Sequence, residues 1–178
     1  MLAVAFFGTL ILGVKIGIFA AVGVSMLWFV VKTTRPHYAL LGRLPGTIVY
    51  RNIKRNPDAE TQPHIVALRF DAQFYYGNVS FLKEVVREAE VNMDTELRAL
   101  VLDASAMNQL DSSADTALHE LLRDYRQRGI ELWVANVKGP VKDVMNRSGF
   151  STQLGEQQFT LTVNEAMENA QHWVKQRR

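Results

Sequence analysis

The chain has 178 residues, a formal net charge of +2 and no cysteine. Its length suits one compact domain plus an extension. The lack of cysteine excludes disulfides, thiolate zinc sites and a cysteine nucleophile, and it fits a reducing compartment.

The charge is distributed unevenly along the chain. Residues 1–55 hold seven Lys and Arg and no acid, whereas residues 56–174 hold all 18 Asp and Glu against ten Lys and Arg. Nucleic-acid surfaces need clustered Lys and Arg, so the acidic body argues against a nucleic-acid partner. The basic segment directly follows an apolar run, which is where membrane proteins place their cytoplasmic positive charge.

Residues 1–31 carry a single charge, Lys15, and form an apolar run long enough to span a bilayer, for which about 20 residues suffice. The run fits either one long tilted span or two helices, 2–12 and 16–31, with a break between them. We favour two helices, because a charge between two glycines is costly in hydrocarbon but tolerable at a break.

A secretory signal peptide explains this run less well. No basic residue precedes the apolar stretch, and no small-x-small cleavage site follows it. The basic residues after Val31 predict an integral membrane protein whose following residues lie in the cytoplasm. We therefore expect transmembrane helical segments in 1–32, a juxtamembrane linker in 33–47 and a cytoplasmic domain in 48–178.

The cytoplasmic part alternates predicted strands and helices. Apolar β-rich runs predict strands at 48–53, 65–70, 97–103 and 130–137, with a short extended piece at 159–163. Helical spacing and cap residues predict helices at 78–92 (capped by Asn78), 112–128, 139–149 and from Asn164 or Thr162 to 173. This order predicts an α/β fold with a mostly parallel or mixed sheet flanked by helices.

One turn stands out as a candidate site. The strand at 97–103 ends at Asp103, a polar loop follows, and Asp111, Ser112 and Ser113 open the next helix. Free backbone N–H groups and the positive end of a helix dipole favour an anion at such a position. These four residues are the candidate phosphoacceptor or the candidate anion or nucleotide loop.

Two interpretations of Ser112 remain open. Ser112 can be the helix N-cap, with Asp115 three residues on in a capping-box-like start. It can instead be a phosphoacceptor, although Asp111 and Asp115 would repel a phosphate. Residue chemistry alone favours the cap, because hydroxyl caps are common.

Other chemistry has weaker support. Asp71, Asp103 and Asp111 could form a carboxylate cluster for Mg²⁺ or for acid–base work, but such acids more often order loops and caps. The four histidines lack metal-ligand spacing, and Walker A, Gly-x-Gly-x-x-Gly and Gly-x-Ser-x-Gly motifs are absent. We therefore predict no catalytic residues, no metal site and no cofactor.

Four stretches together resemble the C-terminal part of a SulP-type anion transporter, in which the last membrane helices precede a cytoplasmic STAS (sulfate transporter and anti-sigma factor antagonist) domain. The stretches are Leu12-Gly13-Val14-Lys15-Ile16-Gly17-Ile18, Arg35-Pro36-His37 with Gly42-Arg43-Leu44-Pro45-Gly46-Thr47, Arg69-Phe70-Asp71-Ala72 with Tyr76 and Asn78, and Val101-Leu102-Asp103 with Asp111-Ser112-Ser113-Ala114. They occur in the order and with the spacing of that family and cover nearly the whole chain.

The resemblance implies a protein that moves sulfate, bicarbonate or related anions, often as a homodimer. Its STAS domain would regulate transport, contact the transporter membrane domain and bind a nucleotide or a cytoplasmic regulatory protein. In stand-alone STAS antagonists the serine after the Asp of this loop is phosphorylated, and the matching position is Ser112. The family's anion site lies in membrane helices that this sequence does not include, so this polypeptide alone is not expected to transport.

Three functions therefore compete. The first is the regulatory end of a SulP transporter, which the linker motif and the broken membrane segment favour. The second is a membrane-tethered STAS phosphoswitch that acts through Ser112. The third is an enzyme with a site at Asp103, Asp111 and Ser112, and only the position of the loop supports it.

Overall fold

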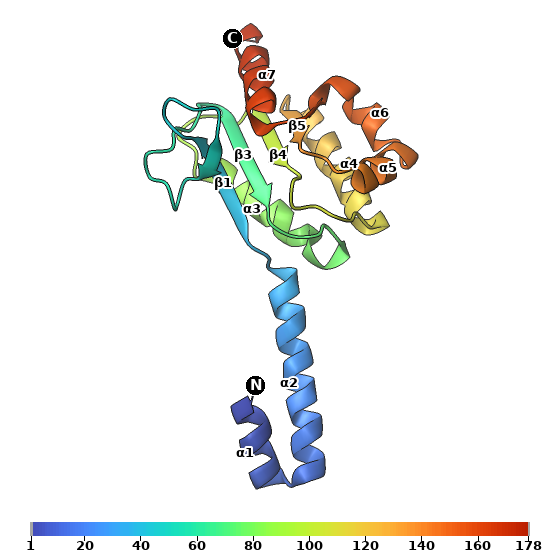
Figure 1. Ribbon diagram of the computed structural model, residues 1–178. Helices are drawn as coiled ribbons and strands as arrows, with labels where there is room; N and C mark the ends of the chain where they lie inside the picture. Colours follow the sequence, from blue (N-terminus) through green and yellow to red (C-terminus); the bar gives the residue numbers. More distant parts are fainter. Residues whose placement is uncertain (1, 178) are drawn as a thin grey trace. The chain divides into compact units, whose positions relative to one another are not determined.

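The computed structural model describes residues 2–177, except for the side chains of residues 4, 5, 8, 11 and 12. The chain divides into two units, Met1–Pro36 and His37–Arg178. Figure 1 shows the elements of both units in chain order.

The first unit consists of two helices that pack against each other, α1 (Leu2–Leu12) and α2 (Val14–Thr34). Gly13 separates them with φ +80°, a left-handed conformation that glycine adopts without strain. The predicted break between two apolar helices is thus confirmed. The second helix begins two residues earlier and ends three residues later than predicted.

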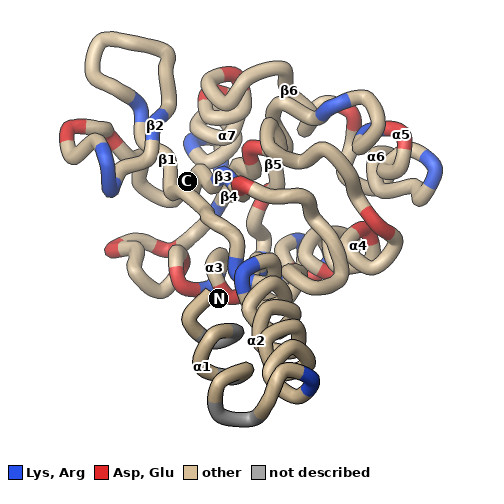
Figure 2. Tube along the Cα trace, turned by 60° about the horizontal axis from the view of Figure 1, so that its bottom comes forward, with Lys and Arg blue, Asp and Glu red and all other residues tan. Residues whose placement is uncertain are grey.

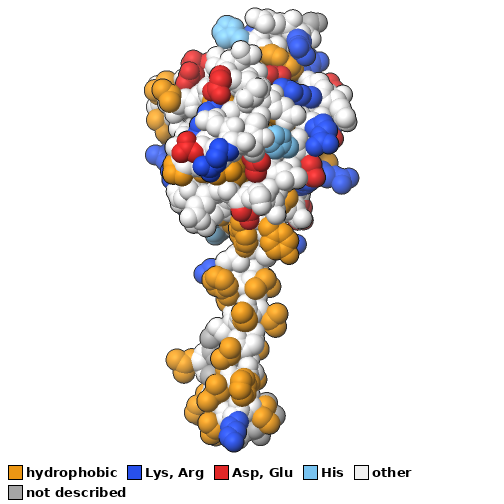
Figure 3. Space-filling model, turned by 90° about the vertical axis from the view of Figure 1, so that its right-hand side faces the viewer, with side chains coloured by type: hydrophobic (Ala, Val, Ile, Leu, Met, Phe, Trp, Pro, Cys, Tyr) orange, Lys and Arg blue, Asp and Glu red, His pale blue; other side chains and the backbone are white. Residues whose placement is uncertain are grey.

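Among the described residues, one helix is long and apolar enough to cross a membrane by length and composition, namely α2 with a mean hydropathy of 2.1. Its 21 residues extend about 30 Å at 1.5 Å per residue. Lys15 and Lys32 are its charged residues, near its two ends, and Figure 2 shows the tan stretch between them. Phe19 and Trp28 are exposed, and Figure 3 shows apolar side chains spread over this unit.

The second unit is built on a six-stranded mixed sheet in the order β2-β1-β3-β4-β5-β6. The strands are β1 (Tyr38–Arg43), β2 (Tyr50–Asn52), β3 (Ile65–Phe70), β4 (Ala99–Asp103), β5 (Glu131–Ala135) and β6 (Phe159–Thr160). Strands β3 to β6 run parallel, and β1 runs antiparallel to both of its neighbours. The predicted α/β class with a mostly parallel or mixed sheet is confirmed.

Strand β1 is a correction to the predicted domain boundary. Residues 38–43 fall within the expected linker, yet they pair with both β2 and β3. Ala39 and Leu41 alternate along β1 and are buried on one face of the sheet. Gly42 suits this strand because a Cβ there would come within 2.9 Å of Ile53. The α/β unit therefore starts about ten residues earlier than predicted, and the strand expected at 48–53 shrinks to β2.

Helices cover both faces of the sheet (Figure 1). One face carries α3 (Val79–Val91), α4 (Ser112–Gln127), α5 (Gly139–Arg147) and α6 (Phe150–Leu154), and the other carries α7 (Val163–Gln176). The larger core includes Leu68, Leu100 and Leu132, whereas Ala67, Val101 and Trp133 face α7. Alternate residues of each parallel strand thus feed two separate cores, as a strand buried on both sides requires.

Two predicted helix caps turn out differently. Thr162 is the N-cap of α7, where its hydroxyl accepts a hydrogen bond from the N–H of Glu165, so the Thr162 alternative is correct. Asn78 precedes α3, but its side chain makes no cap bond to that helix. It instead accepts from the N–H of Tyr75 and donates to the carbonyl of Gln73, which closes the 3₁₀ turn η1 (Tyr76–Asn78).

Candidate functional site

The candidate site lies at the carboxyl edge of the parallel strands. Arg69 of β3, Asp103 of β4 and Ala135 of β5 stand side by side in register. Because the strands are parallel, the loops that follow them emerge at the same edge. Asp71, the loop 104–111 and Asn136 therefore lie along one edge of the sheet.

Asp103 is buried and hydrogen-bonded within the protein. Asp103 is only 5% exposed. Its Oδ1 accepts hydrogen bonds from Asn136 Nδ2 at 2.9 Å and from the N–H of Ser105 at 3.0 Å. These bonds satisfy a buried carboxylate and fix the start of the loop. Asp103 therefore has a structural role, because its hydrogen bonds hold the first residues of the loop that follows β4.

Asn136 is a site residue that the sequence analysis missed. It has φ +58°, a left-handed conformation that Asn tolerates better than most residues. This geometry lets it close the β5–α5 connection while its amide reaches Asp103. The sequence signal that could have identified it is an Asn directly after an apolar strand.

The three acids considered as a cluster do not converge. Asp71 pairs with Arg69, with 2.5 Å between Asp71 Oδ1 and Arg69 Nε, and this hydrogen bond raises the pKa of Arg69. Asp103 binds Asn136, and Asp111 binds backbone amides. Within the described part of the chain, no group of three His, Cys, Asp or Glu side chains could hold a metal ion.

Asp111, and not Ser112, is the N-cap of α4. Its Oδ1 accepts from the N–H of Ala114 at 2.8 Å, and its Oδ2 accepts from the N–H of Tyr76 at 3.0 Å. The cap interpretation of Ser112 is therefore wrong by one residue. Asp111 is favoured over Ser112 as the cap because one of its carboxylate oxygens accepts a hydrogen bond from the helix and the other accepts one from a neighbouring loop.

Ser112 and Ser113 are the first two residues of α4, and both are exposed. Within residues 2–177, no hydrogen bond of either hydroxyl is found, while the Ser112 carbonyl accepts from Thr116 Oγ1. The hydroxyl of Ser112 is thus accessible at the positive end of the helix dipole. The neighbouring Asp111 carboxylate would oppose a phosphate there.

Asp115 does not take part in a capping box. It is only 6% exposed, accepts a hydrogen bond from Ser148 Oγ at 2.9 Å, and lies 3.6 Å from His119 Nε2. Asp115 therefore fastens α4 to the end of α5. No local sequence pattern indicates this pairing, because it joins residues 33 positions apart.

Comparisons with known proteins agree with this architecture. The family model described as STAS domain matches residues 56–166. Probable sulfate transporter 4.2 of Arabidopsis thaliana is 37% identical over 175 residues, which cover 93% of this chain. The chain spans only 26% of the length of that relative. The predicted resemblance to the STAS-containing part of a SulP-type transporter is confirmed.

Solved structures show the same fold. Murine Solute Carrier 26 family member A9, an anion transporter in the inward-facing state, has a TM-score of 0.80 at 20% identity, covering 96% of this chain and 28% of that one. A sulfate transporter family protein from Wolinella succinogenes has a TM-score of 0.59 at 19% identity, covering 70% of this chain and 99% of that one. At these identities the likeness supports the fold alone.

Proposed function

The chain belongs to the STAS domain family, and from this premise we propose that it is the C-terminal regulatory portion of a SulP-type inorganic anion transporter. The observation that carries the proposal is the extent of the similarity to the sulfate transporter. It covers 93% of the chain and so reaches well beyond the STAS match at residues 56–166. The transported anion is sulfate or bicarbonate, and the chain is not an enzyme.

The proposal assigns a place to each unit. Helix α2 lies in the lipid bilayer, with α1 as part of the transporter membrane domain. The basic residues after α2 favour a cytoplasmic STAS domain, starting at β1. In this arrangement the STAS domain contacts the membrane domain and modulates transport or homodimer assembly.

The carboxyl edge of the sheet is the surface that we assign to regulation. Asp111 ties the loop after β3 to the start of α4, and the exposed hydroxyls of Ser112 and Ser113 stand beside it. Side chains on loops held by a rigid sheet are well placed to bind partners. A nucleotide or a cytoplasmic regulatory protein would bind there.

Transport measurements in the native organism test the proposal. The codons for residues 37–178 are deleted from the native gene, and uptake of labelled sulfate and bicarbonate is measured per molecule of protein in the membrane. We expect a lower uptake rate or loss of the dimer on crosslinking. Unchanged uptake and unchanged assembly would contradict a regulatory role.

A membrane-tethered phosphoswitch is the second candidate, and the exposure of Ser112 at the start of α4 favours it. In this case phosphorylation of Ser112 controls the binding of a cytoplasmic partner. Ser112→Ala and Ser112→Asp should then shift partner affinity in opposite directions. Equal affinities of the two variants would exclude this function.

A further inference from the structure

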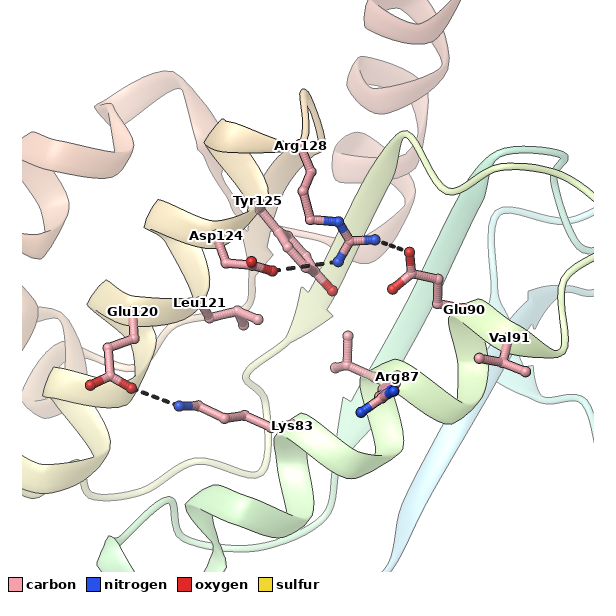
Figure 4. Close-up of a pocket in the computed structure, with 10 residues that line it drawn as sticks. Lys83, Arg87, Glu90, Val91, Glu120, Leu121, Asp124, Tyr125 and Arg128 are labelled. Atoms are coloured by element: carbon pink, nitrogen blue, oxygen red, sulfur yellow. Dashed lines mark hydrogen bonds and ion pairs between the residues drawn. The ribbon is translucent and has the colours of Figure 1, made fainter.

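A groove lies between α3 and α4, lined by residues within 83–91 and 120–128 and so away from Ser112 at the start of α4 (Figure 4). Its volume is about 640 Å³, within the range of small-molecule sites, roughly 300–1,000 Å³. Val86 and Leu121 are buried and supply apolar lining, with the Tyr125 ring between the two helices. The groove therefore offers an apolar floor to a molecule of small organic size.

Two ion-pair groups bridge the groove. Lys83 Nζ lies 2.6 Å from Glu120 Oε2, and Arg128 pairs with both Glu90 and Asp124. Figure 4 shows the Lys83–Glu120 and Glu90–Arg128 pairs as dashed lines that cross between the two helices, whereas the Asp124–Arg128 pair lies along α4 and its C-cap. All three acids that line the groove therefore already have a cationic partner.

Arg87 also lines the groove and takes no part in these ion pairs. It lines the groove one helical turn from Lys83 on α3, on the same helix face. Across the described residues 2–177, it has neither an ion pair nor a hydrogen bond. Its guanidinium is therefore available to an anion, and arginine binds carboxylates and phosphates through two parallel hydrogen bonds.

Tyr125 supplies a second group without a partner. It is only 1% exposed, and its hydroxyl oxygen is buried with no hydrogen bond in the part of the chain that the structure describes. Burial raises the pKa of Tyr125, so the hydroxyl stays protonated and can donate. A buried donor without an acceptor costs free energy, and a hydrogen bond to a ligand oxygen would remove that cost.

We propose that the α3–α4 groove binds a small organic anion that combines an apolar body with one carboxylate or phosphate. The body lies on Val86 and Leu121, the anionic group pairs with Arg87, and the Tyr125 hydroxyl donates to an oxygen of the ligand. This site is separate from the carboxyl edge of the sheet and does not depend on the transporter assignment.

The test compares a charged and a neutral probe of equal shape. The full chain in nanodiscs of zwitterionic lipid, with labelled Val and Leu methyl groups, is titrated with 2-naphthoate and with 2-naphthamide. We expect saturable methyl shifts at Val86 and Leu121, with naphthamide binding at least tenfold more weakly. The methyls of Val101, on the opposite face of the sheet, should not shift.

Variants identify the groups responsible. Arg87→Gln should abolish the tenfold preference for naphthoate, and Tyr125→Phe should weaken naphthoate binding severalfold. Arg123→Gln is the matched control, because Arg123 is an exposed arginine of α4 that does not line the groove. The probe pair on the unchanged chain decides the matter even if a variant misfolds. Equal binding of the two probes, shifts only elsewhere, or full preference in Arg87→Gln would overturn the proposal.

Discussion

The carboxylate of Asp111 accepts a hydrogen bond from the backbone N–H of Tyr76, 3.0 Å away and 35 residues earlier in the chain. Its other oxygen accepts from the N–H of Ala114 and so caps α4. A single side chain thus joins the loops that follow two neighbouring parallel strands. We therefore expect Asp111 to hold the two loops in place at the carboxyl edge of the sheet, the surface that we assign to regulation.

Asp111→Ala should destabilise the second unit by about 1–3 kcal/mol, because it removes an N-cap and a bond between loops. The amides of Tyr76 and Ala114 should exchange their hydrogens faster than in the unchanged chain. Urea unfolding followed by tryptophan fluorescence, together with hydrogen exchange, checks this expectation.

Ser112→Ala is the matched control, because the Ser112 hydroxyl makes no bond found among the described residues. Its effect should stay within about 0.5 kcal/mol, as for other surface substitutions. A larger loss for Ser112→Ala than for Asp111→Ala would mean that Ser112 is the cap after all.

Asn136→Ala should destabilise the chain by about 2–4 kcal/mol in urea unfolding. Asp103 would lose a hydrogen bond while staying buried, and alanine would be strained at φ +58°. Asn136→Gly relieves the strain but not the lost bond, so it should fall between the unchanged chain and Asn136→Ala. Equal stability of all three proteins would show that neither the bond nor the backbone conformation matters.

The pKa of the Glu120 carboxyl is lowered by its hydrogen bond from Lys83. A lowered pKa in the folded state favours folding above the ordinary pKa of glutamate, and this contribution fades as pH falls through the lowered value. Lys83→Met should raise the pKa of Glu120 in a ¹³C NMR titration, whereas the distant Lys138→Met should not. The same pKa in both variants would show that the ion pair is absent in solution.

The orientation of the second unit is testable because the chain has no cysteine. Leu161 is 85% exposed, so Leu161→Cys presents one thiol to a membrane-impermeant maleimide. We expect labelling only after the cells are permeabilised, because the basic residues after α2 favour the cytoplasmic side. Labelling in intact cells would contradict this orientation.

Much of the fold could be predicted because apolar periodicity directly reflects burial. The strand at 65–70 and the helix break at Gly13 match the structure closely, as do the extents of α3 and α4. Strand β1 could not be recognised, since Arg35-Pro36 and the turn residues after Gly42 mask a short run with only two buried residues on one face. In a short strand next to a charged linker, the alternation of apolar and polar residues is too weak to predict the strand.

The candidate site was only partly predictable. The sequence analysis placed Asp103 at the end of a strand and Asp111 and Ser112 at the start of a helix, and the structure has them at these positions. The choice of Asp111 over Ser112 as cap depends on the N–H of Tyr76, which only the tertiary fold brings near. The partners of Asp103 and Asp115 lie 33 residues away and follow from strand and helix packing, not from local spacing.

The size of the native protein tests the transporter proposal most directly. An antibody against residues 60–178 would be used to blot membranes from the native organism. The proposal predicts a band much larger than the 20.1 kDa of this chain, because the anion site requires further membrane helices. A band at 20.1 kDa would contradict it and favour the tethered phosphoswitch.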